Sequence, residues 1–231
     1  MALFQITCFS KTLGKENELI VLTPDAHEGP MRVVYQLHGH GDCASTWLRQ
    51  TCLERYAKQN RVMLVLPDGG KGWYTDACTG QFNCESHILE TITFVDQHFN
   101  TVQSRCARGI GGIGMGGYGA LKLALKHPEL FGTVAVHSAN IDLERLRPDR
   151  EPLLRSVFGD IVPEEDDCFR LAERLGRMQP MLHLDCGTRD ELHPENLAFH
   201  QHLKSLDIPH RFAEYPGGHS WSYWEAHLPA A

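Results

Sequence analysis

Short apolar runs alternate with helical patterns along most of the chain, and this alternation limits the fold more than any other feature of the sequence. The apolar runs predict buried strands at Arg32–Leu37, Arg61–Leu66, Ala107–Ile113, Gly132–His137, Met181–Cys186 and His210–Tyr215. Between them, apolar residues recur every three or four positions and predict helices at Thr46–Gln59, Glu85–Phe99, Gly116–His127 and Pro194–Leu206. Apolar strands separated by helices are typical of a parallel sheet that is covered on both faces. The sequence therefore predicts an α/β fold with a mostly parallel sheet.

Two segments depart from this alternation. Glu18–Pro24 and Arg32–Leu37 resemble strands with no helix between them, which predicts an antiparallel hairpin at one edge of the sheet. Residues 140–167 are rich in Pro, Asp, Glu and Arg and exceed an ordinary connection in length, so we expect short helices or a lid there. A chain of 231 residues without repeats or linkers suits one domain, so the expected organisation is a single domain over residues 1–231.

The charge balance excludes some classes of partner. The chain has 29 acidic and 22 basic residues and a formal net charge of −7, which argues against binding to nucleic acid or to an anionic membrane surface. No apolar run approaches the ~18 residues that a membrane span needs. The N-terminal residues lack a basic segment followed by an apolar one, as a signal peptide would have. We therefore expect no membrane partner and a cytoplasmic location.

Cysteine and histidine are frequent but are not spaced as metal ligands. The eight cysteines form no CxxC pair and the fourteen histidines form no HExxH pattern, so we expect no metal. In a long chain without a secretory signal the thiols are expected to be reduced. Only Cys78 and Cys84 lie close enough in the sequence to suggest a local disulfide across a loop.

The most informative segment is glycine-rich and joins a predicted strand to a predicted helix. It reads Gly112-Ile113-Gly114-Met115-Gly116 and stands where a nucleophile elbow, G-x-S-x-G, would stand. The tight turn needs small residues two positions before and after the nucleophile, and Gly112 and Gly116 meet this need. Gly114 occupies the position of the serine. Two other interpretations stay open: a phosphate-binding turn, although a dinucleotide fingerprint belongs after the first strand of its unit, and a turn that only permits close packing.

Residues elsewhere in the chain complete an arrangement typical of hydrolases. In α/β-hydrolases the order along the chain is nucleophile, acid, histidine. Asp190 and His219 each follow a predicted strand, so both are expected at the carboxyl edge of the sheet. An oxyanion hole needs two backbone N–H groups. The N–H of Met115 is one candidate donor, and the N–H of His40, in the glycine-containing loop of residues 37–41, is the other.

These residues lie in segments that resemble the esterase D family of α/β-hydrolases. The family includes tributyrin esterases, S-formylglutathione hydrolases, feruloyl and acetylxylan esterases, and mycolyltransferases. The matching segments span nearly the whole chain in family order: Leu37-His38-Gly39, Leu66-Pro67-Asp68-Gly69-Gly70-x-x-Trp73-Tyr74-Thr75-Asp76, Met115-Gly116-Gly117-Tyr118-Gly119-Ala120, His137-Ser138, Asp185-Cys186-Gly187-Thr188-x-Asp190 and Pro216-Gly217-Gly218-His219-Ser220-Trp221-x-x-Trp224.

The resemblance implies an α/β-hydrolase fold and a serine carboxylesterase that acts on a short-chain or aromatic acyl ester without a cofactor. It implies that Asp190 and His219 are the acid and the base, and that Trp73 and Tyr74 lie near the acyl pocket. Trp221, in the motif that contains His219, is a third expected substrate-binding residue. Members of the family often assemble into homo-oligomers, so a second copy of the chain is a further expected partner.

The sequence departs from the family pattern at the nucleophile. Gly114 lacks the attacking oxygen, and loss of a triad nucleophile costs on the order of 10⁶ in turnover. Three explanations stay open: an esterase inactivated by substitution, a natural pseudoenzyme that binds an acyl ester or glycoside, and direct activation of a water molecule by His219. An acyltransferase also stays open, because transfer and hydrolysis share one acyl-enzyme. The expected function is a carboxylesterase scaffold whose turnover is nearly abolished in the Gly114 form.

Overall fold

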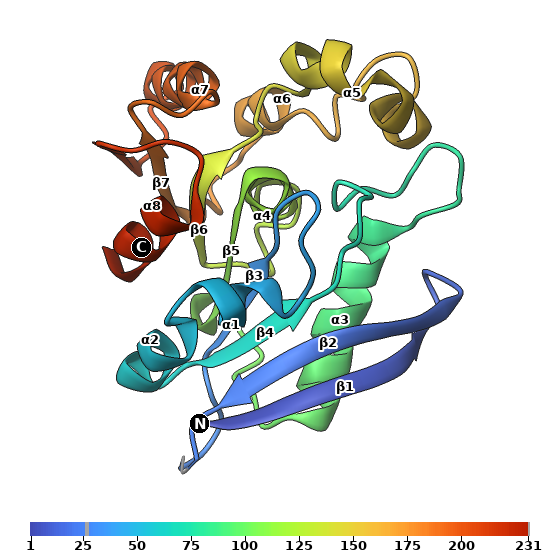
Figure 1. The fold of residues 1–231 in the computed structure, drawn as a ribbon, viewed down its shortest axis with the longest axis vertical. Coiled ribbons are helices and arrows are strands. Elements are labelled where there is room, and N and C mark those ends of the chain that lie inside the picture. The colour runs from blue at the N-terminus through green and yellow to red at the C-terminus, as the bar shows by residue number, and fades with distance from the viewer. Residues whose placement is uncertain (26–27, 231) are drawn as a thin grey trace.

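The computed structural model describes residues 1–25 and 28–230, which contain an eight-stranded sheet in the order β1-β2-β4-β3-β5-β6-β7-β8 (Figure 1). The strands are β1 (Ala2–Ser10), β2 (Lys15–Thr23), β3 (Val33–Leu37), β4 (Met63–Pro67), β5 (Arg108–Ile113), β6 (Thr133–Ala139), β7 (Met181–Gly187) and β8 (His210–Tyr215). Neighbouring strands run parallel from β4 across to β8, whereas β1 with β2 and β2 with β4 are antiparallel. The predicted α/β fold with a mostly parallel sheet is confirmed.

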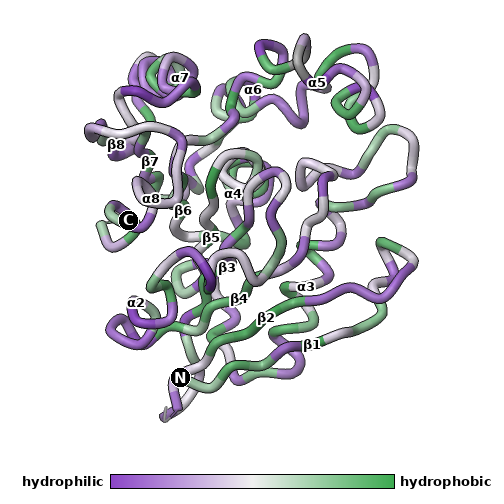
Figure 2. The backbone as a smooth tube through the Cα atoms, in the orientation of Figure 1, coloured by the Kyte–Doolittle hydropathy of each residue, from purple (hydrophilic) through white to green (hydrophobic). Residues whose placement is uncertain are grey.

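Helices cover both faces of the sheet. They are α1 (Thr46–Gln50), α2 (Leu53–Asn60), α3 (Cys84–His98), α4 (Gly114–Lys126), α5 (Leu143–Phe158), α6 (Cys168–Glu173), α7 (His193–Ser205) and α8 (Trp221–His227), with 3₁₀ turns at Arg105–Ala107 and Leu228–Ala230. Side chains of α3, α4 and α7 join one buried hydrophobic cluster, and side chains of α1, α2 and α8 join a second. Successive residues of β2 alternate between the two clusters, so the clusters lie on opposite faces. Figure 2 shows the hydrophobic residues that run along β2 and β4.

The N-terminal hairpin predicted from Glu18–Pro24 and Arg32–Leu37 is wrong. The strand β2 pairs with β1 on one side and with β4 on the other, and β3 lies in the centre of the sheet between β4 and β5. The buried strand β3 needs hydrogen-bonded neighbours on both sides, which an edge hairpin would not supply. The hairpin partner β1 carries apolar residues on exposed positions, Phe4 and Phe9 among them, and this hides the alternation of a strand.

The other predicted elements are present with small shifts at their ends, apart from two regions. The helix predicted over Thr46–Gln59 is divided into α1 and α2. Residues 140–167 hold α5 and the connection to α6, where the sequence predicts short helices or a lid. Arg150 is non-helical, with φ of −131° and ψ of 22°, and lies between Pro148 and Pro152. Two short helical pieces therefore meet at a kink within α5, because proline interrupts helical hydrogen bonding.

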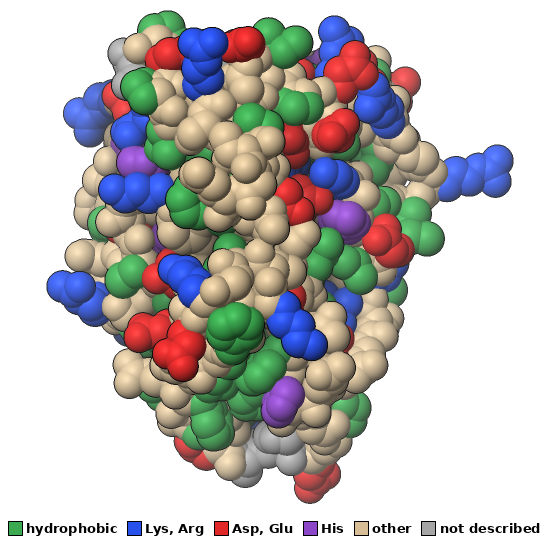
Figure 3. Space-filling view, turned by 90° about the vertical axis from the view of Figure 1, so that its right-hand side faces the viewer, with side chains coloured by type: hydrophobic (Ala, Val, Ile, Leu, Met, Phe, Trp, Pro, Cys, Tyr) green, Lys and Arg blue, Asp and Glu red, His purple; other side chains and the backbone are tan. Residues whose placement is uncertain are grey.

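The surface charges, the helices and the cysteines give no sign of a nucleic-acid, membrane or metal site among the described residues. Acidic and basic side chains are interspersed over one face of the molecule (Figure 3). None of the described helices is long and apolar enough to cross a membrane. Among the side chains that the structure describes, no group of three or more His, Cys, Asp or Glu residues is placed to hold a metal ion. All eight cysteines are free: Cys84 is buried, whereas Cys78 is exposed and its Sγ lies 3.7 Å from the carbonyl oxygen of Ser156 in α5.

Candidate active site

The elbow, defined as residues 112–116, joins β5 to α4. Gly114 is the first residue of α4 and has φ of 52°, in the left-handed region where a side chain is strained. A Cβ on Gly112 would collide with the carbonyl group of Gly116. A Cβ on Gly116 would lie 2.5 Å from the carbonyl oxygen of His38, at the end of β3. Close backbone contacts therefore require both flanking glycines, as the elbow pattern predicts.

The imidazole of His219 faces Gly114. A Cβ on Gly114 would lie 3.5 Å from Nε2 of His219 and 3.4 Å from Oδ1 of Asn140. Both are ordinary contact distances, so a Cβ has room there, although φ of 52° strains any residue other than glycine. A hydroxyl on that Cβ comes within hydrogen-bond reach of Nε2.

The carboxylate of Asp190 orients His219. Nδ1 of His219 lies 3.1 Å from Oδ2 of Asp190, and Oδ1 of Asp190 also accepts the backbone N–H of Leu192 at 2.9 Å. Burial alone raises the pKa of Asp190, but hydrogen bonds from His219, the Leu192 amide and Ser138 outweigh burial and hold this pKa below its ordinary value. The ionised carboxylate accepts the proton on Nδ1, which leaves Nε2 as the basic nitrogen beside the elbow.

Backbone amides lie beside the elbow at two places. The first residues of a helix have N–H groups without acceptors inside the helix, and Met115 holds such a position at the start of α4. Gly39 and His40, from the loop after β3, line the same cavity as Met115. The two segments are suited to hold an anionic oxygen between them, and the assignment of the Met115 and His40 amides as its donors stays a prediction.

Two buried aromatic side chains hold the start of the loop after β3 by hydrogen bonds to its backbone. Nε1 of Trp47 donates to the carbonyl oxygen of Leu37 at 3.1 Å, and the hydroxyl of Tyr74 donates to the carbonyl oxygen of His38 at 3.0 Å. Tyr74 is fully buried and packs against Gly119 of α4. Within the described structure, Tyr74 therefore supports the loop and is not among the side chains that line the cavity.

A cavity of about 610 Å³, here called the main cavity, lies over the elbow. Its walls include most of the predicted site residues: His40, Trp73, Gly114, Met115, His219 and Trp221. Asp190 lies behind His219, at the hydrogen-bond distance given above. The structure therefore brings together residues that follow the strands β3, β4, β5, β7 and β8, at the carboxyl edge of the sheet, as expected for this edge of an α/β fold.

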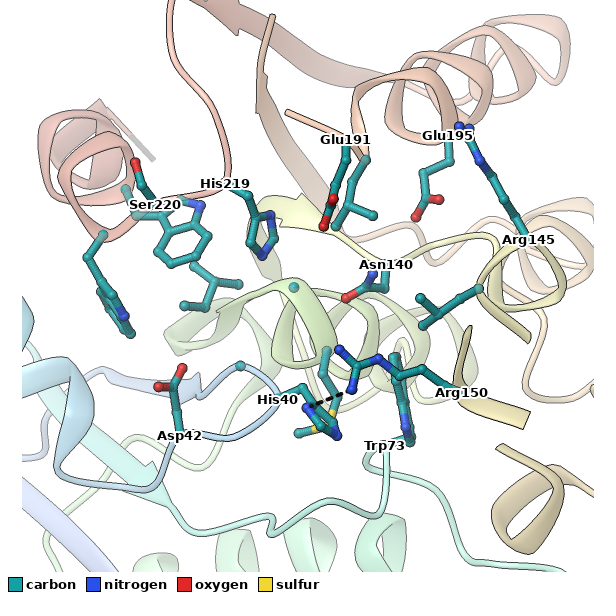
Figure 4. A pocket seen from close by; sticks show the side chains of 18 residues that line it. His40, Asp42, Trp73, Asn140, Arg145, Arg150, Glu191, Glu195, His219 and Ser220 are labelled. Carbon is teal, nitrogen blue, oxygen red and sulfur yellow. Dashed lines mark hydrogen bonds between the residues drawn. The ribbon is translucent and has the colours of Figure 1, made fainter. Parts of the chain in front are cut away.

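The walls of the main cavity also carry polar residues that the sequence did not single out. These are Asp42, Asn140, Arg145, Arg150, Glu191 and Glu195 (Figure 4). Asn140 directly follows β6, so the rule that the carboxyl ends of parallel strands meet at one edge was sufficient to find it. No sequence signal indicated Arg150, because its direction depends on the kink in α5.

Comparison with known proteins gives relatives over the full length of the chain. The chain matches the family model "Esterase", described as "Putative esterase", over residues 10–231. It is 28% identical over 257 aligned positions to an acetyl esterase of Caldicellulosiruptor saccharolyticus, and the alignment covers 100% of this chain and 97% of the relative.

Solved structures agree with this match. FphF, a fluorophosphonate-binding serine hydrolase of Staphylococcus aureus, has a TM-score of 0.92 at 26% identity, with coverage of 99% of this chain and 96% of that chain. The S-formylglutathione hydrolase FrmB of Staphylococcus aureus has a TM-score of 0.90 at 26% identity, with the same coverage of 99% and 96%. The chain therefore belongs to the esterase family of α/β-hydrolases.

Proposed function

We propose that this protein is a serine-carboxylesterase scaffold in which Gly114 occupies the place of the nucleophile. The substrate class is a short-chain or aromatic acyl ester. The observation that carries the proposal is the distance of 3.5 Å between a Cβ on Gly114 and Nε2 of His219, at a turn where φ of 52° matches a strained elbow. In the Gly114 form the attacking oxygen is absent, and we expect turnover to be nearly abolished.

A serine at position 114 would carry out acyl transfer with groups already in place. Its Oγ attacks the ester carbonyl carbon while Nε2 of His219 takes the hydroxyl proton, and the carbonyl oxygen becomes an oxyanion held by amides at Met115 and His40. The intermediate collapses to an acyl-enzyme, and His219 returns the proton to the leaving alcohol. Water then attacks the acyl-enzyme: His219 takes a proton from the water molecule and returns it to Oγ as the carboxylic acid is released. Asp190 stabilises the imidazolium formed in both halves.

The test compares the protein with its Gly114→Ser and Gly114→Ala variants on p-nitrophenyl acetate and butyrate. We expect kcat/KM of Gly114→Ser to exceed that of the Gly114 form by at least about 10³, because loss of a triad nucleophile costs on the order of 10⁶. Gly114→Ala is the matched control, since it adds the same Cβ at the same strained φ without the hydroxyl. A folded Gly114→Ser variant no faster than Gly114→Ala would overturn the assignment of this site.

The absence of a hydroxyl at position 114, beside an intact Asp190–His219 pair, also supports a second candidate, a pseudoenzyme that binds an ester or glycoside in the main cavity without cleaving it. This candidate predicts saturable binding and thermal stabilisation by such ligands in the Gly114 form, with no product released. Activity in the Gly114 form that Gly114→Ala abolishes would instead indicate a water molecule activated by His219. An acyltransferase would divert the acyl group to an added alcohol in the Gly114→Ser variant.

A further inference from the structure

Two nitrogen atoms of residues on one side of the main cavity are buried and have no hydrogen-bond partner among the described residues. Trp73 is 1% exposed and lines the cavity, and its Nε1–H has no partner among the described residues. Nε2 of His40, whose ring centroid lies 6.3 Å from that of Trp73, also has no partner in the part of the chain that the structure describes. A buried donor without an acceptor is destabilising, so this arrangement favours a ligand that supplies acceptors.

The third donor is Arg150. Its Nη1 donates to Nδ1 of His40 at 3.3 Å, which makes Nε2 of His40 the protonated nitrogen and hence a donor. Burial lowers the pKa of His40, and the charges of Arg150 and Lys71 lower it further, so this imidazole is neutral at neutral pH. No carboxylate of the described residues pairs with Arg150, and His40 accepts only one of its five N–H groups.

The kink in α5 brings Arg150 to this position. Arg150 is the non-helical residue between Pro148 and Pro152, and Figure 4 shows its guanidinium beside His40 and Trp73. Three carboxylates line the cavity: Glu191 and Glu195 are on the opposite side, where Arg145 lies beside Glu195, and Asp42 lies on the far side of His40 from Trp73. The guanidinium of Arg150 is therefore the charged group that lies next to both His40 and Trp73.

We propose that the side of the main cavity formed by His40, Trp73 and Arg150 is an anion subsite that selects esters whose acyl group ends in a carboxylate. The substrate class is the half-ester of a dicarboxylic acid. This inference rests on the proposed function for the reacting ester, since Trp73 lies on the expected acyl side. A carboxylate offers acceptors for the guanidinium, the indole N–H and the imidazole N–H together, and hydrogen bonds to charged groups are the strong ones.

Binding to the Gly114 form tests the subsite without turnover. Calorimetric or NMR titration with monomethyl succinate is compared with titration with dimethyl succinate, the neutral ester of similar shape. We expect the half-ester to bind at least about tenfold more tightly, because hydrogen bonds to a charged group contribute about 1.5–3 kcal/mol. Raising the salt concentration should weaken binding of the half-ester only, since screening acts on the ionic contact.

Two variants and a control locate the subsite. Arg150→Gln should remove the preference for the half-ester and change binding of dimethyl succinate less than about threefold, since it deletes the charge and keeps a polar side chain. Trp73→Phe should weaken half-ester binding by about three- to tenfold, the value of one hydrogen bond to a charged acceptor. The matched control is Arg155→Gln on the same helix, because Arg155 is 63% exposed and pairs with Asp160.

Equal binding of the two esters, or an unchanged preference in Arg150→Gln, would overturn the anion subsite. Inorganic phosphate is a further probe: if phosphate competes with monomethyl succinate as strongly as succinate itself does, the site recognises any anion and its assignment to the acyl carboxylate is wrong. The proposed function has its own test: a Gly114→Ser variant that is inactive on p-nitrophenyl esters would overturn it. That result would not change the binding preference measured in the Gly114 form.

Discussion

The floor of the main cavity and its α5 wall are built by different kinds of contact. The floor is the elbow with Asp190 and His219, where backbone atoms approach so closely that added Cβ atoms on the flanking glycines would collide. The α5 wall is defined as Arg145, Leu146 and Arg150, and its two arginines are exposed along a kinked helix that contains two prolines. The floor is held by backbone contacts at the edge of the sheet, whereas the wall is held by apolar side chains of α5, such as Leu146 and Leu154, that pack on the main hydrophobic cluster.

The difference separates two tasks. Chemistry at an ester carbonyl requires donors and base within a few tenths of an ångström, and only a position fixed by buried backbone gives that precision. Choice of substrate requires side chains that differ between relatives without disturbing the sheet. Substitutions in the floor are therefore expected to change the rate or the stability by large factors, and substitutions in the wall to change which ester binds.

The largest expected effect is on activity and is confined to the floor. In the Gly114→Ser background, Asp190→Asn should lower kcat by about 10⁴, because an amide donor at this place enforces the wrong tautomer of His219. Arg150→Gln in the same background should change kcat on p-nitrophenyl butyrate less than about threefold, since this neutral ester has no carboxylate to pair with Arg150. Steady-state kinetics of both double variants give the comparison. A loss of similar size in both would show that wall and floor act as one unit.

The next effect is on stability, through a buried lysine that ties α4 to the segment between α5 and α6. Lys122 is fully buried, and its Nζ donates to Thr75 at 2.7 Å, to Glu85 at 2.8 Å and to Asp166 at 3.1 Å. Lys122→Met should lower the free energy of unfolding by about 3 kcal/mol, because Glu85 and Asp166 lose their fully buried partner and keep only the partly exposed Lys126, 3.0 Å from Glu85.

Urea denaturation measures this change in Lys122→Met, with Arg155→Gln on the α5 helix as the comparison. The pair of Arg155 with Asp160 is 63% and 79% exposed, so its loss should change the free energy of unfolding by less than about 0.5 kcal/mol. A destabilisation of Lys122→Met under about 1 kcal/mol would contradict the view that the contact between Lys122 and Asp166 holds the segment between α5 and α6 against α4.

The smallest effect concerns Glu195, which lies between the two regions. Its Oε1 accepts the N–H of Ile141 at 2.8 Å, and burial raises its pKa to about 7, despite opposing hydrogen bonds from backbone N–H groups. The folded state then holds a proton that the unfolded state has lost between about pH 4.5 and 7, so stability falls as pH rises through this range. Glu195→Gln keeps the acceptor and removes the titration.

Urea denaturation of the protein and of Glu195→Gln at pH 5.5 and pH 8 checks this sign. The protein should lose about 1–2 kcal/mol more of its free energy of unfolding than the variant between the two pH values. An equal loss in both proteins would mean that Glu195 is ionised in the folded state at the lower pH, as an exposed carboxyl is.

The sequence predicted the floor better than the wall, for physical reasons. Asp190 and His219 follow parallel strands, and the topology of such a sheet brings strand ends to one edge whatever the details of packing. The place of β3 was missed because strand order depends on contacts distant in the sequence, and β1 has no clear alternation. Arg150 was missed because a kink between two prolines decides where its side chain points, and Pro spacing alone does not give that direction.

The contacts around Gly114 also bear on how easily hydrolytic activity is gained or lost. An added Cβ there meets only ordinary neighbours, so no second substitution is needed to make room for serine. Some glycine codons become serine codons by the change of one base. Where Gly114 has such a codon, a library of random variants selected for growth on an ester is expected to gain activity by a single change at this position.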